Sequence, residues 1–415
     1  RLRVGGSKNY TSRYVLAATL ADGVSVLHNP ANIDDAQVMV ACCMRLGARI
    51  EQTADRLIVT GAGRGLQSPG ELNVGNAGAV ARFLMAIAAT MPSPTRFVTP
   101  YPESLGRRPH DDLLQALGSL GCSCESRDGR LPITIGGGLR RGGHVRVSGA
   151  VSSQFTSALL FLAPLLIGPT HIEVYGPQRS APLLLQTLEV LHTSGIKVKH
   201  RDLRHFTIEG PQPYRAGERL IPGDWPGAAA ILAAAAVTES NVTLTGLSDD
   251  AQGERAVVDV LRTMGSDVTF DATSRQVRIR GGQPLRAVEF DGDQATDAVM
   301  AMVAAACFAH GTSRFVNIEN LRYKESDRIS DYCRVLTQMG AQVEETLDSI
   351  IVHGTPDTLP GGVCVDAHND HRLLMGAAIV ALRCRQPVRL TGVEHIAKSY
   401  PSFFEDLKKL GARIH

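Results

Sequence analysis

The sequence predicts an α/β protein with two lobes, each built from three copies of a βαββαβ-like repeat. Two observations lead to this fold class. A short apolar stretch, a glycine and a further apolar strand recur together six times, and successive copies are 70 to 75 residues apart. The recurring glycines are Gly47, Gly121, Gly195, Gly265, Gly340 and Gly411. Six α/β units of this length are too many for one hydrophobic core, so we expect two lobes of three repeats.

The elements within each repeat follow one order. A short strand of alternating polarity comes first, and an amphipathic helix then ends at the recurring glycine, which suits the left-handed conformation that follows many helix C-termini. One strand follows the glycine, and in five copies a second strand follows the first. A more apolar helix then leads into the next repeat. These apolar helices are expected at 13–21, 80–90, 155–166, 227–237, 298–309 and 372–382.

Composition excludes several functional classes. The chain has 43 Lys plus Arg and 41 Asp plus Glu, a net charge of +2, whereas general nucleic-acid binders carry a strong basic excess. The longest apolar runs, 158–167 and 228–237, have ten residues each and are too short to cross a bilayer as helices. No leader typical of a signal peptide is visible. We therefore expect neither a nucleic-acid nor a membrane partner.

The sequence also gives no sign of a cofactor. Its eight cysteines are scattered, without a CxxC pair or a regular Cys/His spacing, so we expect reduced thiols in a cytoplasmic protein and no metal site. There is no P-loop and no glycine-rich loop joining a strand to a helix. The GAGRG stretch at 61–65 is rich in glycine but opens no clear helix. We therefore expect a reaction that needs no cofactor.

Short polar segments precede the six apolar helices and predict the kind of ligand. The segments are 5–9, 75–78, 152–154, 222–224, 296–297 and 368–372. Helix N-termini present N–H groups without helical partners and the positive end of the helix dipole, and both favour anions. If the repeats gather these N-termini on one side, they line a cleft for an anionic, phosphorylated small molecule.

The most densely charged stretch is NLRYKESDR, which lies between an apolar run and a helix-like segment. Four of its charged side chains cannot all share one helical face at their spacing: Arg322, Lys324, Glu325 and Arg328. A turn into a helix start would point Lys324, Glu325 and Arg328 inward. We expect Asp327 to be structural and to pair with a neighbouring arginine. The ordinary alternative for this stretch is a network of salt bridges on the surface.

Eight short motifs occur in order along the chain. They are GGSKN with Arg13, GNAG with Arg82, RRP at 107–109, VSSQF at 151–155, PGD at 222–224, NLRYKESDR, NDHR at 369–372 and AKSYP at 397–401. Together they make the sequence similar to the 5-enolpyruvylshikimate-3-phosphate synthase family over essentially its whole length. The resemblance implies a fold of the enolpyruvyl transferase type that closes around its substrates. It also implies an N-terminal lobe of residues 7–222 and a C-terminal lobe of residues 1–6 plus 223–415.

The family transfers the enolpyruvyl group of phosphoenolpyruvate to the 5-hydroxyl of shikimate 3-phosphate, through a tetrahedral intermediate, and releases phosphate. Two phosphates and two carboxylates are held close together, so many cations are needed, and the planar fork of arginine suits both anions. The resemblance implies that phosphoenolpyruvate is bound by Lys8, Gly78, Arg108, Gln154, Arg328, Arg372 and Lys398. It implies that shikimate 3-phosphate is bound by Lys8, Asn9, Arg13, Ser152, Ser153, Gln154, Ser180, Asp297, Asn320 and Lys324. We expect a monomer with these two substrates as its partners.

The resemblance further implies that Asp297 and Glu325 are the acid/base pair, with Lys8 as a third candidate. One group takes the proton of the attacking hydroxyl, and one helps to protonate the methylene carbon, but the sequence does not apportion the two transfers. A carboxylate between cations can stay ionised as a base. Asp297, Ser152 and Ser153 also have an ordinary interpretation as helix caps. Their recurrence at equivalent points of the repeat favours a functional site.

Several positions depart from the family pattern. Asn9 stands where serine usually follows the lysine, and Gly6 stands where proline is usual. Ala79 replaces a threonine and Phe83 a proline on the helix after GNAG. Changes on that helix can move Gly78 and alter the discrimination between phosphoenolpyruvate and its inhibitor glyphosate. We therefore expect reduced sensitivity to glyphosate with retained catalysis.

Other functions stay open at the level of the sequence. A sister enolpyruvyl transferase would use another acceptor, such as UDP-N-acetylglucosamine, but that group usually carries a reactive cysteine on a loop, and the equivalent loop PESLGRRP has none. A non-catalytic binding homologue would lose its acid/base groups, yet Asp297, Glu325 and Lys8 are present. RNA 3′-phosphate cyclases have related repeats, but the balanced charge and the absence of their nucleotide-linked histidine signature argue against them.

Overall fold

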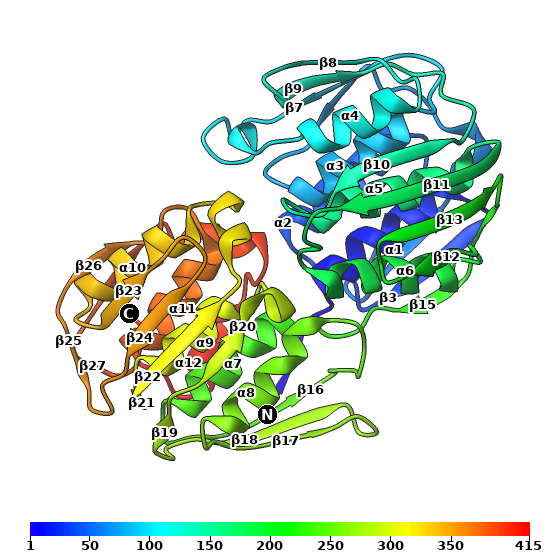
Figure 1. Ribbon diagram of the computed structural model, residues 1–415. Helices are drawn as coiled ribbons and strands as arrows, with labels where there is room; N and C mark the ends of the chain where they lie inside the picture. Colours follow the sequence, from blue (N-terminus) through cyan, green and yellow to red (C-terminus); the bar gives the residue numbers. More distant parts are fainter. The chain divides into compact units, whose positions relative to one another are not determined.

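The structure of residues 1–415, a computed structural model, contains two compact units. The N-terminal unit consists of Gly6–Ile221, and the C-terminal unit consists of Arg1–Gly5 together with Pro222–His415. Figure 1 shows that each unit combines helices with several small sheets, and that the N-terminus lies beside the strand β16 of the C-terminal unit. No helix in the structure has the length and hydrophobicity that a membrane span requires.

The N-terminal unit contains three four-stranded sheets of one design. In each sheet the first strand of a repeat pairs in parallel with one strand from outside that repeat's hairpin. On its other side it pairs antiparallel with the second strand of the hairpin that follows it in the repeat. The late strand β15 (Glu218–Leu220) pairs with the early strand β3 (Val24–His28), so the three repeats close on themselves. The other strands are β2 (Ala21–Asp22), β4 (Arg49–Gln52), β5 (Arg56–Thr60), β6 (Glu71–Asn73), β7 (Thr95–Val98), β8 (Cys124–Arg127), β9 (Arg130–Ile135), β10 (His144–Ser148), β11 (Gly168–Tyr175), β12 (Lys199–Arg201), β13 (His205–Gly210) and β14 (Tyr214–Arg215).

Two kinds of helix occur in the N-terminal unit. The core helices are α1 (Lys8–Leu20), α3 (Gly78–Ala88) and α5 (Ser153–Leu162), and almost all of their side chains are buried. Phe83 of α3 meets Phe161 of α5 with ring centroids 5.4 Å apart. The outer helices bury one face only, as amphipathic helices do; they are α2 (Asp34–Arg45), α4 (Asp111–Ser119) and α6 (Ala181–Thr193).

The C-terminal unit begins with the first residues of the chain. Strand β1 (Leu2–Arg3) pairs in parallel with β16 (Asn241–Thr245), so the N-terminus supplies an edge strand to a sheet of this unit. Two sheets have four strands, but the sixth repeat ends after one strand, and its sheet holds only β26 (Cys364–Asp366) and β28 (Arg389–Thr391). The other strands are β17 (Asp267–Asp271), β18 (Gln276–Arg280), β19 (Leu285–Arg286), β20 (Glu289–Asp291), β21 (Ala309–His310), β22 (Thr312–Val316), β23 (Gln342–Glu345), β24 (Ile350–His353), β25 (Leu359–Gly361) and β27 (Cys384–Gln386).

The core helices of the C-terminal unit are α7 (Trp225–Ala236), α9 (Val299–Ala306) and α11 (His371–Ala381). Small side chains let them approach one another closely. A β-carbon at Gly376 of α11 would lie 2.1 Å from the hydroxyl oxygen of Tyr332, and that hydroxyl donates to the Met300 carbonyl of α9 at 3.0 Å. The glycine therefore lets one tyrosine link three helices. The outer helices are α8 (Ala256–Thr263), α10 (Arg328–Gln338) and α12 (Phe403–Lys409).

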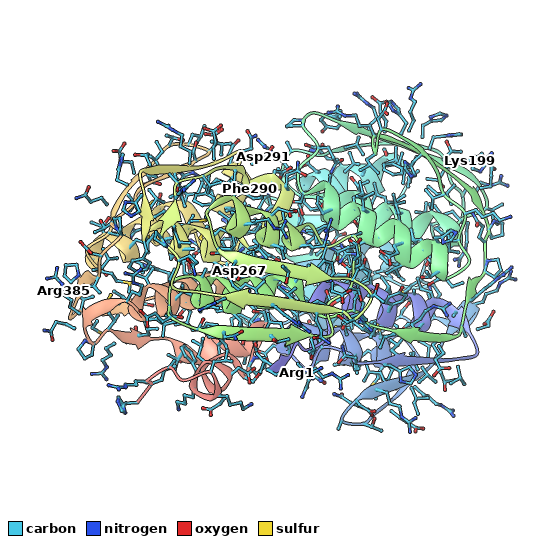
Figure 2. All side chains as sticks on the ribbon, turned by 90° about the horizontal axis from the view of Figure 1, so that it is seen from below. Arg1, Lys199, Asp267, Phe290, Asp291 and Arg385 are labelled. Carbon is cyan, nitrogen blue, oxygen red and sulfur yellow. The ribbon has the colours of Figure 1, made fainter.

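Charged side chains on the strands stay at the surface. Lys199 on β12, Asp267 on β17 and Arg385 on β27 are exposed, and Figure 2 shows Lys199 and Arg385 at the margins of the structure. The buried charges described below are therefore exceptions to the general pattern of this chain.

The six recurring glycines end the six outer helices as predicted. Their φ angles lie between 84° and 106°, a region that L-residues with a β-carbon rarely occupy. The residue after each glycine donates its backbone N–H to the carbonyl five residues earlier, at 2.9 to 3.2 Å, which is the Schellman arrangement. The donor and acceptor pairs are Ala48–Cys43, Cys122–Leu117, Ile196–Leu191, Ser266–Leu261, Ala341–Leu336 and Ala412–Leu407.

Asn29 joins the two ends of the N-terminal unit. Its side-chain Nδ2 donates to the Ile221 carbonyl at 3.2 Å, and its backbone is left-handed with a φ of 56°. A β-carbon on Gly6 would lie 1.9 Å from the Asn29 carbonyl oxygen. Gly6 is therefore required by this close approach, because any larger residue would place its β-carbon against the Asn29 carbonyl.

Candidate active site

Arg328, the first residue of α10, is the centre of a buried charge cluster in the C-terminal unit. Its side chain is 2% exposed, and each of its nitrogens contacts a different carboxylate. Nε lies 2.8 Å from Oδ2 of Asp370, Nη2 lies 2.8 Å from Oε2 of Glu325, and Nη1 lies 3.3 Å from Oδ1 of Asp297. Burial alone would lower the pKa of Arg328, but the three carboxylates raise it above its usual value. Arg328 therefore stays charged and holds three carboxylates around itself.

Two further cations belong to this cluster. Nζ of Lys398 lies 3.1 Å from Oε1 of Glu325, and Nη2 of Arg372 lies 3.6 Å from Oδ2 of Asp297. Asp297 and Glu325 therefore each lie between two cations, an environment that favours the ionised form of a carboxylate. The three cations and the three carboxylates of the cluster carry no net formal charge together.

Arg372 keeps donors that no protein atom uses. Its side chain is 3% exposed, and its Nε and Nη1 atoms are buried without a hydrogen-bond partner. Buried donors without partners cost free energy, and those of a charged group cost the most. An anionic ligand at this position would satisfy them, so Arg372 is the residue in the cluster that most directly indicates an anion site.

Asp370 is a member of the cluster that the sequence reasoning did not assign. It is fully buried and caps α11, because its Oδ1 accepts the backbone N–H of Arg372 at 2.8 Å. Its Oδ2 accepts from the hydroxyl of Ser326 at 3.1 Å and from Arg328 at 2.8 Å. Asp370 therefore ties the start of α11 to the start of α10. The signal in the sequence was an Asp directly before an apolar helix, which is a good N-cap residue.

The stretch NLRYKESDR folds as the sequence predicts, as a turn into a helix start. A 3₁₀ helix, η6 (Glu319–Tyr323), precedes α10. Asp327 caps α10 by accepting from the N–H groups of Ile329 and Ser330, at 3.2 and 3.1 Å, and it pairs with Arg322 at 2.8 Å. The structural role predicted for Asp327 is confirmed.

Two predicted substrate residues lie on the same stretch. Asn320 is buried in η6, and its Nδ2 lies 3.5 Å from Oδ1 of Asp293. Lys324 is half-buried and directly precedes the cluster member Glu325. Both residues are therefore on the segment that leads into the charge cluster.

The backbone N–H of Asp297 is bound by a carboxyl group that was not predicted from the sequence. Asp297 lies between the 3₁₀ helix η5 (Gly292–Ala295) and α9, and its backbone N–H donates to Oε1 of Glu254 at 3.3 Å. Asp297 does not cap α9, since the cap position is Ala298 and no side chain caps there. Burial raises the pKa of Glu254 to about 7, and the Asp297 carboxylate adds to this shift, whereas Arg372 opposes it.

The predicted residues of α1 lie at its start in the N-terminal unit. Lys8 is the first residue of α1, and its Nζ lies 3.4 Å from Oδ2 of Asp35. Asn9 follows and is buried. On α6, the predicted residue Ser180 occupies the position before the helix with a left-handed φ of 52°.

Arg13 is buried inside the N-terminal unit and bonds to the protein itself. Its Nε donates to the hydroxyl of Thr187 at 2.9 Å, and its Nη atoms donate to the carbonyls of Asn9 and Leu183 at 3.0 and 3.1 Å. Burial lowers the pKa of Arg13 to about 10. Three of the five N–H groups of the guanidinium are thus used within the unit, and the predicted contact with substrate would rely on the others.

Gly78, Arg108 and Gln154 meet at the start of α3. A β-carbon on Gly78 would lie 2.9 Å from Nη1 of Arg108 and 3.8 Å from Oε1 of Gln154. Arg82, one turn later on α3, donates to Gln154 Oε1 at 2.8 Å and to the hydroxyl of Ser152 at 3.1 Å. Ser152 also caps α5, of which Ser153 is the first residue. The glycine is therefore required by the position of Arg108, and Arg82 organises this group without having been assigned from the sequence.

A groove in the C-terminal unit lies apart from this site. It has a volume of about 1430 Å³ and lies in the C-terminal unit, beside the two-stranded sheet and the last residues of the chain. Its lining includes Ile231, Leu382, Leu390, Phe404 and Ile414. The members of the charge cluster do not line it, so it is separate from the buried carboxylates and cations around Arg328.

The predicted residues therefore form two sets, one in each unit. In the C-terminal unit four of them belong to the cluster around Arg328, and two lie on the segment that precedes Glu325. In the N-terminal unit most lie at the starts of the core helices and of α6, whereas Arg13 lies inside α1 and Arg108 lies beside Gly78. The predicted residues of the C-terminal unit are Asp297, Asn320, Lys324, Glu325, Arg328, Arg372 and Lys398. Those of the N-terminal unit are Lys8, Asn9, Arg13, Gly78, Arg108, Ser152, Ser153, Gln154 and Ser180.

Solved structures with the same fold define the class of this protein. An EPSP synthase from Acinetobacter baumannii matches with a TM-score of 0.82 and 25% identity, over 99% of this chain and 95% of that one. The enolpyruvyl transferase NikO from Streptomyces tendae shares the fold, with a TM-score of 0.79 and 19% identity over 100% of this chain and 95% of that one. The fold is thus that of an enolpyruvyl transferase, which confirms the predicted fold class.

The family follows from sequence comparison. Residues 1–407 match EPSP synthase, 3-phosphoshikimate 1-carboxyvinyltransferase. The 3-phosphoshikimate 1-carboxyvinyltransferase of Deinococcus radiodurans is 48% identical over 100% of this chain and 93% of its own length, and that of Burkholderia pseudomallei is 37% identical over 98% and 91%. The chain belongs to the EPSP synthase family. It is a transferase of the shikimate pathway, with the activity 3-phosphoshikimate 1-carboxyvinyltransferase (EC 2.5.1.19), as the sequence predicted.

Proposed function

We propose that this chain transfers the enolpyruvyl group of phosphoenolpyruvate to the 5-hydroxyl of shikimate 3-phosphate with the two groups of residues described above. In this assignment Arg328, Arg372 and Lys398 bind the anionic groups of phosphoenolpyruvate. The observation that carries it is the buried Arg372, whose Nε and Nη1 have no partner in the protein and lie in the same cluster as two acid/base candidates. Lys8, Gly78, Arg108 and Gln154 are assigned to the same substrate.

Shikimate 3-phosphate is assigned to residues of both units. From the N-terminal unit we propose Lys8, Asn9, Arg13, Ser152, Ser153, Gln154 and Ser180, and from the C-terminal unit Asp297, Asn320 and Lys324. Hydroxyl, amide and ammonium donors of this kind suit a phosphate and a polyhydroxylated ring. The N-termini of α1 and α5 support the assignment, because helix starts favour anions.

The acid/base chemistry is proposed for Asp297 and Glu325. In the addition step the 5-hydroxyl oxygen bonds to C2 of phosphoenolpyruvate, the hydroxyl proton passes to a carboxylate, and C3 gains a proton to become a methyl group. In the elimination step the bond from C2 to the phosphate oxygen breaks, phosphate leaves, and C3 loses a proton to restore the double bond. Both carboxylates lie between cations, which supports an ionised base at neutral pH. Lys8 is the third group able to exchange a proton.

Phosphate release tests the proposed function. Purified protein is incubated with phosphoenolpyruvate in the presence and in the absence of shikimate 3-phosphate, and inorganic phosphate is measured. We expect release that depends on shikimate 3-phosphate and is stoichiometric with the enol ether product. Release that needs a different acceptor would assign the chain to a sister transferase, and binding of both ligands without release would make it a non-catalytic homologue.

The cellular location and the oligomeric state of the protein are proposed as well. We infer that the protein acts as a cytoplasmic monomer without nucleic-acid or membrane partners. Its eight cysteines are free thiols, as in proteins of reducing compartments, and its net charge is close to zero. Sedimentation at micromolar concentration tests the oligomeric state, and a mass twice that of the chain would contradict it.

A further inference from the structure

Glu254 is a buried carboxyl group to which no part of the chemistry described above has been assigned. It lies in the 3₁₀ helix η4 (Gly253–Arg255), and the residue is 3% exposed. Its Oε1 accepts the backbone N–H of Asp297 at 3.3 Å, across 43 residues of sequence. Its Oε2 is buried and has no hydrogen-bond partner. A buried carboxyl oxygen without a donor is costly, so its presence beside the acid/base candidate needs an explanation.

The location of Asp297 explains what Glu254 does. The N–H groups at a helix start have no helical partner and are usually satisfied by a side chain of the cap residue. At the start of α9 the cap position is Ala298, which has no side chain able to accept, and Glu254 supplies an acceptor to the preceding residue from another part of the chain. Glu254 thus fixes the backbone from which the Asp297 side chain extends between Arg328 and Arg372.

We propose that Glu254 is a positioning residue for the transferase reaction, which holds Asp297 in register with Arg328 and Arg372 by accepting its backbone N–H. The inference rests on the acid/base role proposed for Asp297. Glu254 does not need to touch substrate, because it acts through the backbone and the electrostatic field of Asp297.

The charged groups around Glu254 are few. Asp297 and Arg372 face it, whereas its neighbour Arg255 pairs with Asp249 at 3.2 Å. Three other elements pack against this segment. The core helix α7 contains no charged residue, η5 carries Asp293, which accepts from Nδ2 of Asn320 at 3.5 Å, and α8 carries Asp259 and Arg262, which pair with each other at 2.7 Å. Burial and the Asp297 carboxylate raise the pKa of Glu254 to about 7, so the group gains or loses its charge near neutral pH. Its charge is therefore felt most strongly by Asp297 and Arg372.

Two substitutions separate the positioning role from a merely structural one. Glu254→Gln keeps an oxygen that accepts the Asp297 N–H but cannot ionise, and Glu254→Ala removes the acceptor. We expect Glu254→Ala to lower kcat at least about tenfold while KM for each substrate changes less than threefold, since the variant loses only the placement of a reacting group. We expect Glu254→Gln to retain most of the kcat but to lose the inflection near pH 7 from the profile of kcat/KM. Glu289→Gln, an exposed carboxylate on β20, is the matched control and should behave as the wild type.

The outcomes are distinguishable. If Glu254→Ala lowers the melting temperature but keeps the wild-type kcat in its folded fraction, and Glu254→Gln keeps the wild-type pH profile, Glu254 only stabilises the fold and the inference is overturned. If the wild-type protein releases no phosphate with shikimate 3-phosphate, the proposed function has failed instead. Where Glu254→Ala does not fold, the pH profile of Glu254→Gln decides by itself.

Discussion

Glu325 and Arg328 are joined by a 2.8 Å contact between Oε2 and Nη2, although one precedes α10 and the other begins it. The other carboxylate oxygen of Glu325 lies 3.1 Å from Nζ of Lys398, which comes from the last part of the chain. Glu325 is therefore fixed by two cations from separate segments. This arrangement gives the carboxylate one orientation.

Glu325→Gln should lower kcat by about 100-fold or more and change ligand affinity little. The amide keeps the shape and one acceptor oxygen, but it cannot take up or donate the proton that acid/base catalysis requires. Steady-state kinetics measure kcat, and calorimetric titration with shikimate 3-phosphate measures affinity. Glu345→Gln is a suitable control, because Glu345 also pairs with an arginine, Arg322, but lies outside the cluster. Turnover within threefold of the wild type would remove Glu325 from the mechanism.

Arg328→Met should destabilise the C-terminal unit by about 3–5 kcal/mol, the usual cost of removing one partner from a buried ion cluster. Without the guanidinium, three carboxylates repel one another, and they can relieve this by binding protons. The loss should therefore be larger at pH 8 than at pH 5. Urea unfolding at the two pH values measures it. Arg334→Met, an exposed arginine on the same helix, should cost under about 1 kcal/mol at both, and an equal loss in the two variants would contradict the prediction.

Gly78→Ala should raise KM for phosphoenolpyruvate about tenfold or more, with a smaller effect on kcat. The added β-carbon would lie 2.9 Å from Nη1 of Arg108, closer than such contacts allow, so the arginine must move. Gly118→Ala provides the control, because it lies within the helix α4 and a β-carbon there meets no atom within 4 Å. An unchanged KM in Gly78→Ala would mean that Arg108 does not contact phosphoenolpyruvate.

Sensitivity to glyphosate should be low in the wild-type protein and should rise in Ala79→Thr. Phe83 lies on the same helix as Gly78, packs against Phe161 and lies 5.2 Å below the guanidinium of Arg13. We expect this packing and the small Ala79 to set the position of Gly78. Inhibition constants for glyphosate, measured in competition with phosphoenolpyruvate, test the prediction. Tight inhibition of the wild type at the concentrations typical of sensitive relatives would contradict it.

Above pH 7, Glu254→Gln should raise the free energy of unfolding relative to that of the wild type. Burial raises the pKa of Glu254 to about 7, so between its ordinary value and pH 7 the folded state binds more protons than the unfolded state. Stability contributed by this group is present at low pH and is lost as the pH rises towards 7. The glutamine variant lacks this loss, and the difference from the wild type should grow by up to about 3 kcal/mol between pH 4 and pH 8. Chemical unfolding across this range measures it, and parallel curves for the two proteins would exclude a titrating Glu254.

Regular features of the chain were predictable from sequence because they depend on local chemistry. Gly340 ends a helix because its left-handed φ of 98° favours glycine, and the same requirement at each repeat produced a pattern visible in the sequence. Asp327 caps the helix that begins one residue later and pairs with an arginine five residues earlier. Such contacts are short in sequence, so a pattern of residue types is enough to indicate them.

The missed residues act through contacts between distant segments. Asp370 reaches Arg328 across 42 residues and Glu254 reaches Asp297 across 43. Glu254 lies in a short 3₁₀ turn with no periodic pattern, and only the packing of that turn against the start of α9 gives its carboxyl group a partner. Arg13 was predicted to contact substrate. Its hydrogen bond to Thr187 on α6 also depends on tertiary packing, which no local sequence pattern indicates.

The pairing of Leu2 with Leu244 has a consequence for how the chain is made. The ribosome synthesises the first strand of the C-terminal unit before the whole N-terminal unit, and therefore long before its partner strand exists. Gly6–Ile221 is continuous and can fold during that interval. Its folding brings Gly6 and Ile221 to the same residue, Asn29. The loop that must close between β1 and β16 is then much shorter than the chain that separates them in sequence, which lowers the entropic cost of their pairing. When β16 is synthesised later, its partner β1 is therefore already held near the position where the two strands pair.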